Sequence, residues 1–226
     1  MTGTSDMRRG GIDRRDFLIT TAGVAAAAVG VGTSGTALAQ ASAPPAPSSE
    51  TPPPTKAILV ERLPGGILMI GIDRPEAKNR IDPAMLLGIG KAYYQLEHDD
   101  ELRVGVLYAK GPDFVSGLDV PAYEAAARAG QLPPKDPDFI QPAGLRAPSR
   151  TKPVVVAVQG ATRTVGHELM LACDVRVAAD DTVFAQSEVT AGLFAIAGAT
   201  IRFPREAGWA NAMRYMLTGD TWNADG

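Results

Sequence analysis

Two glutamates stand in stretches of the chain that are otherwise apolar. Glu168 lies in GHELMLACDVRV, and Glu188 is the only ionisable residue of TVFAQSEVTAGLFAIAGATI. Burial raises the pKa of a carboxyl group toward neutrality, and a carboxyl with such a pKa can both donate and accept a proton. The two residues therefore indicate proton transfer. The alternative is that each forms a structural ion pair with an arginine such as Arg163 or Arg202.

Two glycine-containing loops could supply backbone N–H groups beside these acids. PDFVSGLDV follows an apolar stretch and turns at Gly117, where the missing Cβ permits unusual dihedral angles or the close approach of a ligand. QGATRTVGHEL leaves a second apolar stretch and enters a helical pattern near Val165 and Gly166. N–H groups at the start of a helix have no acceptor within it. Such loops suit a reaction that builds negative charge on a carbonyl oxygen, although ordinary strand-to-helix turns produce the same pattern.

Alternating strand and helix patterns must position these residues. AILVERL and GILMIGIDRP flank PGG and predict a hairpin, and Asp82 followed by Pro83 predicts the start of a helix. Further strands are predicted at 104–109, 153–160 and 174–179, and further helices at 120–129, 165–173 and 207–218. This alternation predicts an α/β domain over residues 57–226. The five prolines of residues 130–150 predict an exposed excursion near a ligand site.

Two neighbours of Glu168 are expected to be structural. His167 lies about 100° around the helix from Glu168, so we expect it to pack or to face solvent rather than to join the chemistry. Cys173 at the end of the same helical pattern is expected to be a small core residue.

Composition excludes several classes of function. The 226 residues carry a formal charge of −3, which offers no basic field to nucleic acid. One cysteine and two histidines provide no Cys/His spacing of the metal-ligand type, so no metal site is expected.

The N-terminal residues are of a different kind. Residues 1–39 contain RRDFLITTAGVAAAAVGVGTSGTALA, which is similar to a twin-arginine export signal and predicts a periplasmic or secreted protein. The stretch is weakly hydrophobic, so stable membrane insertion is not expected after signal removal. Residues 40–56, rich in Pro, Ser and Ala, predict a linker.

From about Ala57 to Gly226 the chain resembles the enoyl-CoA hydratase/isomerase family, the crotonase superfamily. The resemblance rests on IDRPEAKNRID, FVSGLDV, KPVVVAVQGATRTVGHELMLACDVRVAADDTVFAQSEVTAGL and RYMLTGDTWNADG, which occur in the family's order. It implies a crotonase-like spiral of ββα units that lacks the C-terminal helices of the family. Family members form homotrimers or hexamers, an assembly that the missing helices leave open.

The resemblance also implies a site. The backbone N–H groups of Leu118 and Val165 would form an oxyanion hole for a thioester carbonyl, and Glu168 and Glu188 would be the catalytic acids. The substrate would contact the following residues: Ser116, Gly117, Asp119 and Gly166. Coenzyme A would belong to the substrate, with no other cofactor and no metal. Many members have consecutive glycines where this chain has Thr164-Val165-Gly166, so the second donor sits on a β-branched residue that must still adopt the required backbone angles.

The activity so implied is addition of water to an α,β-unsaturated acyl-CoA. Enoyl-CoA isomerisation, hydrolysis of a carbon–carbon bond in a β-diketone and a catalytically silent binding protein are the alternatives. An export signal conflicts with a cytoplasmic coenzyme A ester. Either the signal is not used and the protein is cytoplasmic, or the substrate is a carbonyl compound without coenzyme A, or the activity is vestigial.

Overall fold

The computed structural model describes residues 57–132 and 136–225. The expected export signal at 1–39 and the linker at 40–56 lie outside these residues. None of the helices in the described part of the chain has the length and apolar character that a membrane span needs.

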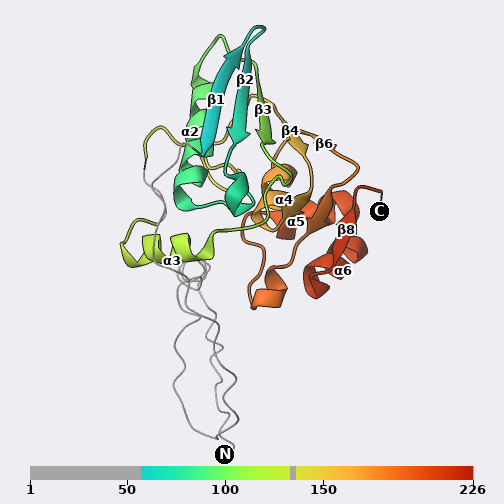
Figure 1. The fold of residues 1–226 in the computed structure, drawn as a ribbon. Helices are drawn as coiled ribbons and strands as arrows, with labels where there is room; N and C mark the ends of the chain where they lie inside the picture. The colour runs from blue at the N-terminus through green and yellow to red at the C-terminus, as the bar shows by residue number, and fades with distance from the viewer. Residues whose placement is uncertain (1–56, 133–135, 226) are drawn as a thin grey trace, which may run out of the picture. The chain divides into compact units, whose positions relative to one another are not determined.

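A five-stranded sheet forms the larger part of the fold (Figure 1). Its strands, in spatial order, are β1 (Ile58–Leu63), β2 (Ile67–Ile72), β3 (Val104–Ala109), β4 (Val154–Val158) and β6 (Val175–Ala178). β1 and β2 are antiparallel, and all later neighbours are parallel, with Val106 opposite Val155 and Val155 opposite Val175. The hairpin and the three later strands predicted from the sequence are confirmed.

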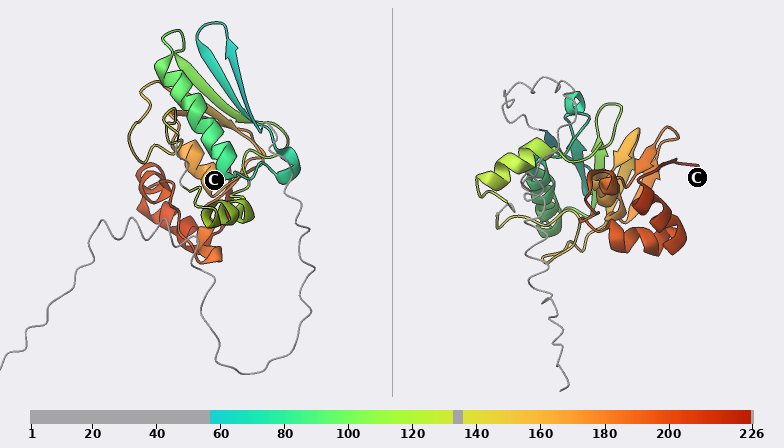
Figure 2. Two further views of the ribbon diagram at one scale, coloured as in Figure 1. Left: turned by 90° about the vertical axis from the view of Figure 1, so that its left-hand side faces the viewer. Right: turned by 90° about the horizontal axis from the view of Figure 1, so that it is seen from below.

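Helix α2 (Pro83–His98) packs on one face of this sheet against β1, β2 and β3 (Figure 2, left). Its start is fixed as expected, because an Asp82 carboxylate oxygen accepts the N–H of Met85 at 2.7 Å and Pro83 occupies the first turn. The core between helix and sheet consists mainly of Leu68, Ile70, Ile72, Met85, Ile89, Tyr93, Leu96, Leu107, Val154 and Val156.

A second sheet is built from three short strands, β5 (Ala161–Arg163), β7 (Val183–Ala185) and β8 (Thr221–Asn223), in that spatial order. β5 and β7 are parallel and β8 is antiparallel to β7. The remaining elements are η1 (Pro75–Ala77), α3 (Val120–Arg128), α4 (Val165–Leu171), η2 (Glu188–Ala191), α5 (Ala199–Ala207) and α6 (Trp209–Thr218). The last two helices and β8 lie together on the β6 side of the large sheet (Figure 1).

Two expectations about the later segments need correction. The helix expected at 207–218 is α6 and begins at Trp209, because Gly208 adopts a left-handed φ of +79° and separates it from α5, a helix that the sequence did not predict. Residues 136–150 are not wholly exposed. Ile140 is buried and donates its N–H to the carbonyl of Gly90 on α2 at 3.1 Å, so this segment packs on the helix.

Candidate active site

The segment that contains Gly117 is held on one side by the residues that follow η1. The N–H and the hydroxyl of Ser116 both donate to the carbonyl of Lys78, at 3.2 and 2.8 Å. Ile81 donates its N–H to the carbonyl of Gly117 and accepts the N–H of Asp119, both at 2.9 Å. These bonds form a short parallel β-bridge between Ile81 and Leu118.

A buried asparagine anchors this arrangement. Asn79 is fully buried, and its side-chain amide donates to the carbonyls of Lys110 and Asp113, both at 2.8 Å, while its oxygen accepts the N–H of Arg74 at 2.8 Å. Its backbone has a φ of +50°, a left-handed conformation that asparagine tolerates better than most residues. The sequence offered no signal for this role.

On its other side the same segment contacts β5 and the start of α4. The N–H of Val115 donates to the carbonyl of Ala161 at 3.0 Å, and Arg163 donates to the carbonyl of Val115 at 2.9 Å. A Cβ built on Gly166 would lie 2.7 Å from the carbonyl oxygen of Val115. Only glycine therefore lets the start of α4 approach this closely.

The two predicted N–H donors, those of Leu118 and Val165, lie in loops that the fold brings together. Ile81 pairs with the residues on either side of Leu118, so the N–H of Leu118 points away from Ile81. The residue before Leu118 lies close to the start of α4, because a Cβ built on Gly117 would lie 3.2 Å from the Thr164 hydroxyl. Within residues 57–132 and 136–225, neither N–H has a protein acceptor.

In the second loop the unusual backbone angles belong to Thr164, one residue earlier than Val165, for which they were expected. Val165 is the first residue of α4, whereas Thr164 adopts φ 48° and ψ −117°. This combination is rare for a residue with a β-branched side chain. The N–H of Thr164 donates to the carbonyl of Ala185 at 2.9 Å, which fixes the turn.

Glu168 lies on α4 and is 2% exposed. One carboxylate oxygen, Oε1, accepts the N–H groups of Ala197 and Ala199 at 2.7 and 3.1 Å, and neither bond uses Oε2. The pKa of Glu168 is raised to about 7, chiefly by burial and also by the charge of Glu188, while the two N–H donors oppose the change. The bond from the N–H of Thr164 to the carbonyl of Ala185 joins the start of α4 to the residues before Glu188, so the two glutamates lie on adjoining segments.

Glu188 is half-buried at the start of η2. Its Oε1 accepts a hydrogen bond from the side-chain amide of Gln186 at 2.7 Å, and its Oε2 is buried with no hydrogen-bond partner in the described part of the chain. Burial raises the pKa of this carboxyl too. Across the described residues neither Glu168 nor Glu188 forms an ion pair, so the reading of two structural ion pairs with Arg163 or Arg202 is wrong.

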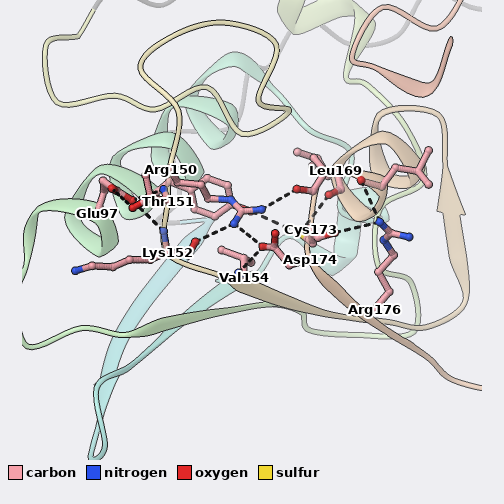
Figure 3. A network of polar contacts seen from close by, with 12 residues as sticks. Glu97, Arg150, Thr151, Lys152, Val154, Leu169, Cys173, Asp174 and Arg176 are labelled. Atoms are coloured by element: carbon pink, nitrogen blue, oxygen red, sulfur yellow. Dashed lines mark hydrogen bonds and ion pairs between the residues drawn. The ribbon is translucent and has the colours of Figure 1, made fainter. Parts of the chain in front are cut away.

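Two arginines fix the opposite end of the helix that carries Glu168 (Figure 3). Arg150 donates to the carbonyl of Ala172 at 2.7 Å and pairs with Asp174 at 2.5 Å. Arg176 donates to the carbonyls of Met170 and Cys173 at 3.0 and 3.2 Å. Carbonyls in the last turn of a helix lack partners within it, and arginine side chains here supply them.

His167 on α4 and Cys173, two residues beyond the end of that helix, are both buried. Cys173 is a core residue, as expected, and its thiol donates to the carbonyl of Leu169 at 3.3 Å. His167 packs inside the protein rather than facing solvent, but it also contacts Gln186, with 2.5 Å between Nδ1 and the amide oxygen. The sequence reasoning missed this contact and the buried Gln186; the only signal was a glutamine two positions before Glu188.

The side chains of two predicted substrate-binding residues have protein partners. The hydroxyl of Ser116 is bonded to Lys78, and the carboxylate of Asp119 accepts from Arg74 at 2.8 Å and caps α3 at Ala122. These contacts order the loop that carries the Leu118 N–H. A contact of either side chain with substrate stays a prediction.

Two hollows of the surface are lined by residues other than the two glutamates. One of about 360 Å³ is lined by Val183, Tyr215 and Trp222 together with neighbours on β8, and one of about 180 Å³ by residues around Arg150 and Asp174. In residues 57–132 and 136–225, no three His, Cys, Asp or Glu side chains gather as metal ligands would.

Comparison with known proteins identifies the family to which this fold belongs. Among solved structures, the probable enoyl-CoA hydratase/isomerase of Mycobacterium abscessus superposes with a TM-score of 0.70 at 41% identity, over 75% of this chain and 65% of that one. The probable enoyl-CoA hydratase 1, peroxisomal, of Arabidopsis thaliana is 31% identical over 168 residues, 74% of this chain and 62% of that protein.

Carnitinyl-CoA dehydratase of Salmonella paratyphi B is 34% identical over 166 residues, 71% of this chain and 60% of that protein. The chain thus spans about three fifths of the length of these two curated relatives. The α/β fold is crotonase-like, as expected, and the model of the enoyl-CoA hydratase/isomerase family matches residues 62–226. The chain belongs to the enoyl-CoA hydratase/isomerase family.

Proposed function

We propose that the protein adds water across the C2–C3 double bond of an α,β-unsaturated acyl-CoA thioester. The names of its relatives, which are hydratases and a dehydratase, support this reaction class. The observation that carries the proposal is a pair of glutamates on adjoining segments, Glu168 buried on α4 and Glu188 with a buried Oε2 that has no partner in the described part of the chain. Beside them lie two backbone N–H groups without protein acceptors, those of Leu118 and Val165.

The N–H groups of Leu118 and Val165 receive the thioester carbonyl oxygen in this reaction. Attack on C3 moves electrons onto that oxygen and produces an enolate, so the donors bind more strongly as the reaction proceeds. Removal of one such donor typically costs about 3 kcal/mol of barrier. The contacts that fix the segment around Gly117 and the turn at Thr164 hold both donors in place before the substrate arrives.

The two glutamates divide the proton transfers. Glu168, with its pKa of about 7, is partly ionised at neutral pH and takes a proton from water as the water oxygen bonds to C3. The electrons of the double bond pass to C2 and the carbonyl. C2 then takes a proton from protonated Glu188, whose Oε2 has no protein partner. The O–H bond of water, the C2–C3 π bond and the O–H bond of Glu188 break, and a C–O bond, a C–H bond and an O–H bond on Glu168 form. Glu168 then releases its proton to solvent and Glu188 takes one up, so the net change is one water added.

Two acids rather than one favour hydration over isomerisation, in which a single acid can carry a proton from one carbon to another. Water and the thioester are the only reactants, so the proposed reaction uses no cofactor beyond the coenzyme A portion of the substrate.

We infer that the protein acts on this substrate class whether it is a monomer or an oligomer. Light scattering of the purified chain would decide between a monomer and the trimers or hexamers expected for the family.

The test compares three activities of the purified full chain: hydration of crotonyl-CoA, isomerisation of a 3-enoyl-CoA and cleavage of a β-diketone. We expect hydration, reduced about 10²- to 10⁴-fold in Glu168→Gln and in Glu188→Gln. Glu101→Gln, a change at an exposed carboxylate, is the matched control and should keep the wild-type rate. Diketone cleavage without hydration would replace the proposal, and equal rates in all variants would refute the roles of both glutamates.

The cellular location is proposed from the sequence alone. The residues of the twin-arginine-like signal at 1–39 imply export to the periplasm or the medium, and an unused signal implies the cytoplasm. Fractionation of cells that express the full chain, beside a variant with Arg14 and Arg15 changed to lysine, tests the signal. Loss of export in the variant supports it, and cytoplasmic protein in both cases contradicts it.

A further inference from the structure

Two buried side chains form a chain of hydrogen bonds that ends on the half-buried Glu188. His167 and Gln186 are 2% and 1% exposed. Nδ1 of His167 lies 2.5 Å from the side-chain oxygen of Gln186, and the side-chain nitrogen of Gln186 donates to Oε1 of Glu188 at 2.7 Å. The chain thus joins α4, which carries Glu168, to η2, which starts at Glu188.

The hydrogen-bonding capacity of these groups fixes the direction of the chain. Oε1 of Glu188 can only accept, both in the carboxylate and in the acid protonated on Oε2, so Gln186 must present its NH₂ group to it. The oxygen of Gln186 then faces His167 and can only accept, so His167 must carry its proton on Nδ1. Burial lowers the pKa of His167 to about 4, which makes the ring neutral near pH 7. A neutral ring with Nδ1 protonated is the form that the chain needs.

Aromatic rings hold the imidazole of His167 in place. Its ring centre lies 4.9 Å from that of Phe203 and 5.2 Å from that of Trp222, both nearly perpendicular to it.

A backbone hydrogen bond joins the same two segments as the contact of His167 with Gln186, because the N–H of Thr164 donates to the carbonyl of Ala185. The start of α4 is therefore joined to the residues before Glu188 at two points.

The consequence for Glu188 is an asymmetric carboxyl group. Its Oε1 is occupied by Gln186, and its Oε2 is buried without a partner in the described part of the chain. Rotation of the carboxyl group would break the bond to Gln186. One oxygen is thus tied to the protein, and the other is left for a reactant.

We propose that His167 is a positioning residue that, through Gln186, orients Glu188 so that Oε2 exchanges the proton with the substrate. This inference rests on the proposed function, in which Glu188 protonates C2. His167 itself touches neither substrate nor reacting atoms. It acts by fixing the angle of a carboxyl group that belongs to another element.

The first test needs no substrate. The chain has two histidines, and His98 is exposed on α2, so long-range ¹H–¹⁵N NMR of the full chain, assigned with His98→Gln, reports the tautomer of His167. We expect a neutral ring with the proton on Nδ1. A proton on Nε2, or a doubly protonated ring at pH 7, would overturn the hydrogen-bond chain.

The second test separates the hydrogen bond from the packing. His167→Phe keeps a ring among Phe203 and Trp222 but removes the donor, whereas His167→Asn keeps a donor near the position of Nδ1. We expect His167→Phe to lower kcat for crotonyl-CoA about 10- to 100-fold, with KM changed less than about twofold, and His167→Asn to restore most of kcat. Gln186→Leu should match His167→Phe. Thermal unfolding of each variant measures the structural effect separately.

The two proposals fail in different ways. A wild-type chain that does not hydrate crotonyl-CoA refutes the proposed function, and the NMR tautomer alone then judges the contact of His167 with Gln186. Hydration that depends on Glu188 but is unaffected by His167→Phe leaves the function standing and refutes the positioning role. Equal losses in the Phe and Asn variants refute it also, because the donor would then make no difference.

Discussion

Replacement of Glu168 by glutamine should stabilise the protein at alkaline pH and not at acid pH. The folded protein raises the pKa of Glu168 from 4.5 to about 7, chiefly by burial. A group whose pKa is raised on folding contributes stability that is fully present below the unfolded pKa and is lost as the pH rises through the folded one. The wild type therefore loses this contribution between about pH 4.5 and pH 7.

The size of the effect follows from the same values. One pKa unit corresponds to about 1.4 kcal/mol, so the change from 4.5 to about 7 is worth about 3 kcal/mol in the free energy of unfolding. This is a large fraction of the roughly 5–15 kcal/mol that stabilises a typical domain. In a domain of this size it corresponds to roughly 6–12 °C in Tm. The glutamine oxygen can still accept the N–H groups of Ala197 and Ala199.

Urea denaturation at pH 5 and pH 8 measures the difference. We expect the free energy of unfolding of Glu168→Gln, measured relative to the wild type, to increase by about 3 kcal/mol from pH 5 to pH 8. The part that the wild type has already lost at pH 5 is subtracted from this figure. Any fixed effect of the new amide is the same at both pH values and cancels. Glu101→Gln, at an exposed carboxylate, measures the general effect of removing one charge. A difference between Glu168→Gln and wild type that does not change with pH would refute the raised pKa.

Three further predictions concern the frame of the site and its pH response. Thr164→Gly should raise the free energy of unfolding by about 1 kcal/mol in urea denaturation, because glycine relieves the φ of +48°; a loss of stability would contradict the strain. Asn79→Ala should lower it by about 2–4 kcal/mol, since three hydrogen bonds of a buried side chain are lost, and a change below 1 kcal/mol would count against the anchor. The kcat/KM for crotonyl-CoA should rise with pH with an apparent pKa near 7 as Glu168 ionises, and the residual rate of Glu168→Gln should lack this rise.

The long elements of the fold were predictable because local signals and packing agree. The strand predicted at 104–109 has the same first and last residue as β3, and Asp82 followed by Pro83 marks the start of α2. The three-residue strands β5, β7 and β8 are too short to show a periodic pattern. Helix α5 was missed because it begins after a glycine, has no side-chain cap and contains Pro204, so only its packing explains it.

The candidate site was also only partly predictable from the sequence. Glu168 and Glu188 could be found because a lone carboxylate in an apolar stretch is visible in the sequence. The carbonyls that accept from the Asn79 amide are 31 and 34 residues away, and the partners of His167 and Glu168 are 19 to 31 residues away. Such contacts exist only once the chain has folded. The constraint at Thr164 was assigned to Val165 because the sequence shows which residues are β-branched but not which one has the unusual angles.

Hydration of crotonyl-CoA in D₂O tests the central claim most directly. Mass spectrometry of the product should show one deuterium at C2 and an oxygen from solvent at C3, formed by the wild type and slowed at least about 100-fold in Glu168→Gln and in Glu188→Gln. Product formed at the wild-type rate by either variant would contradict the account, because the reaction would then need no proton transfer by that glutamate.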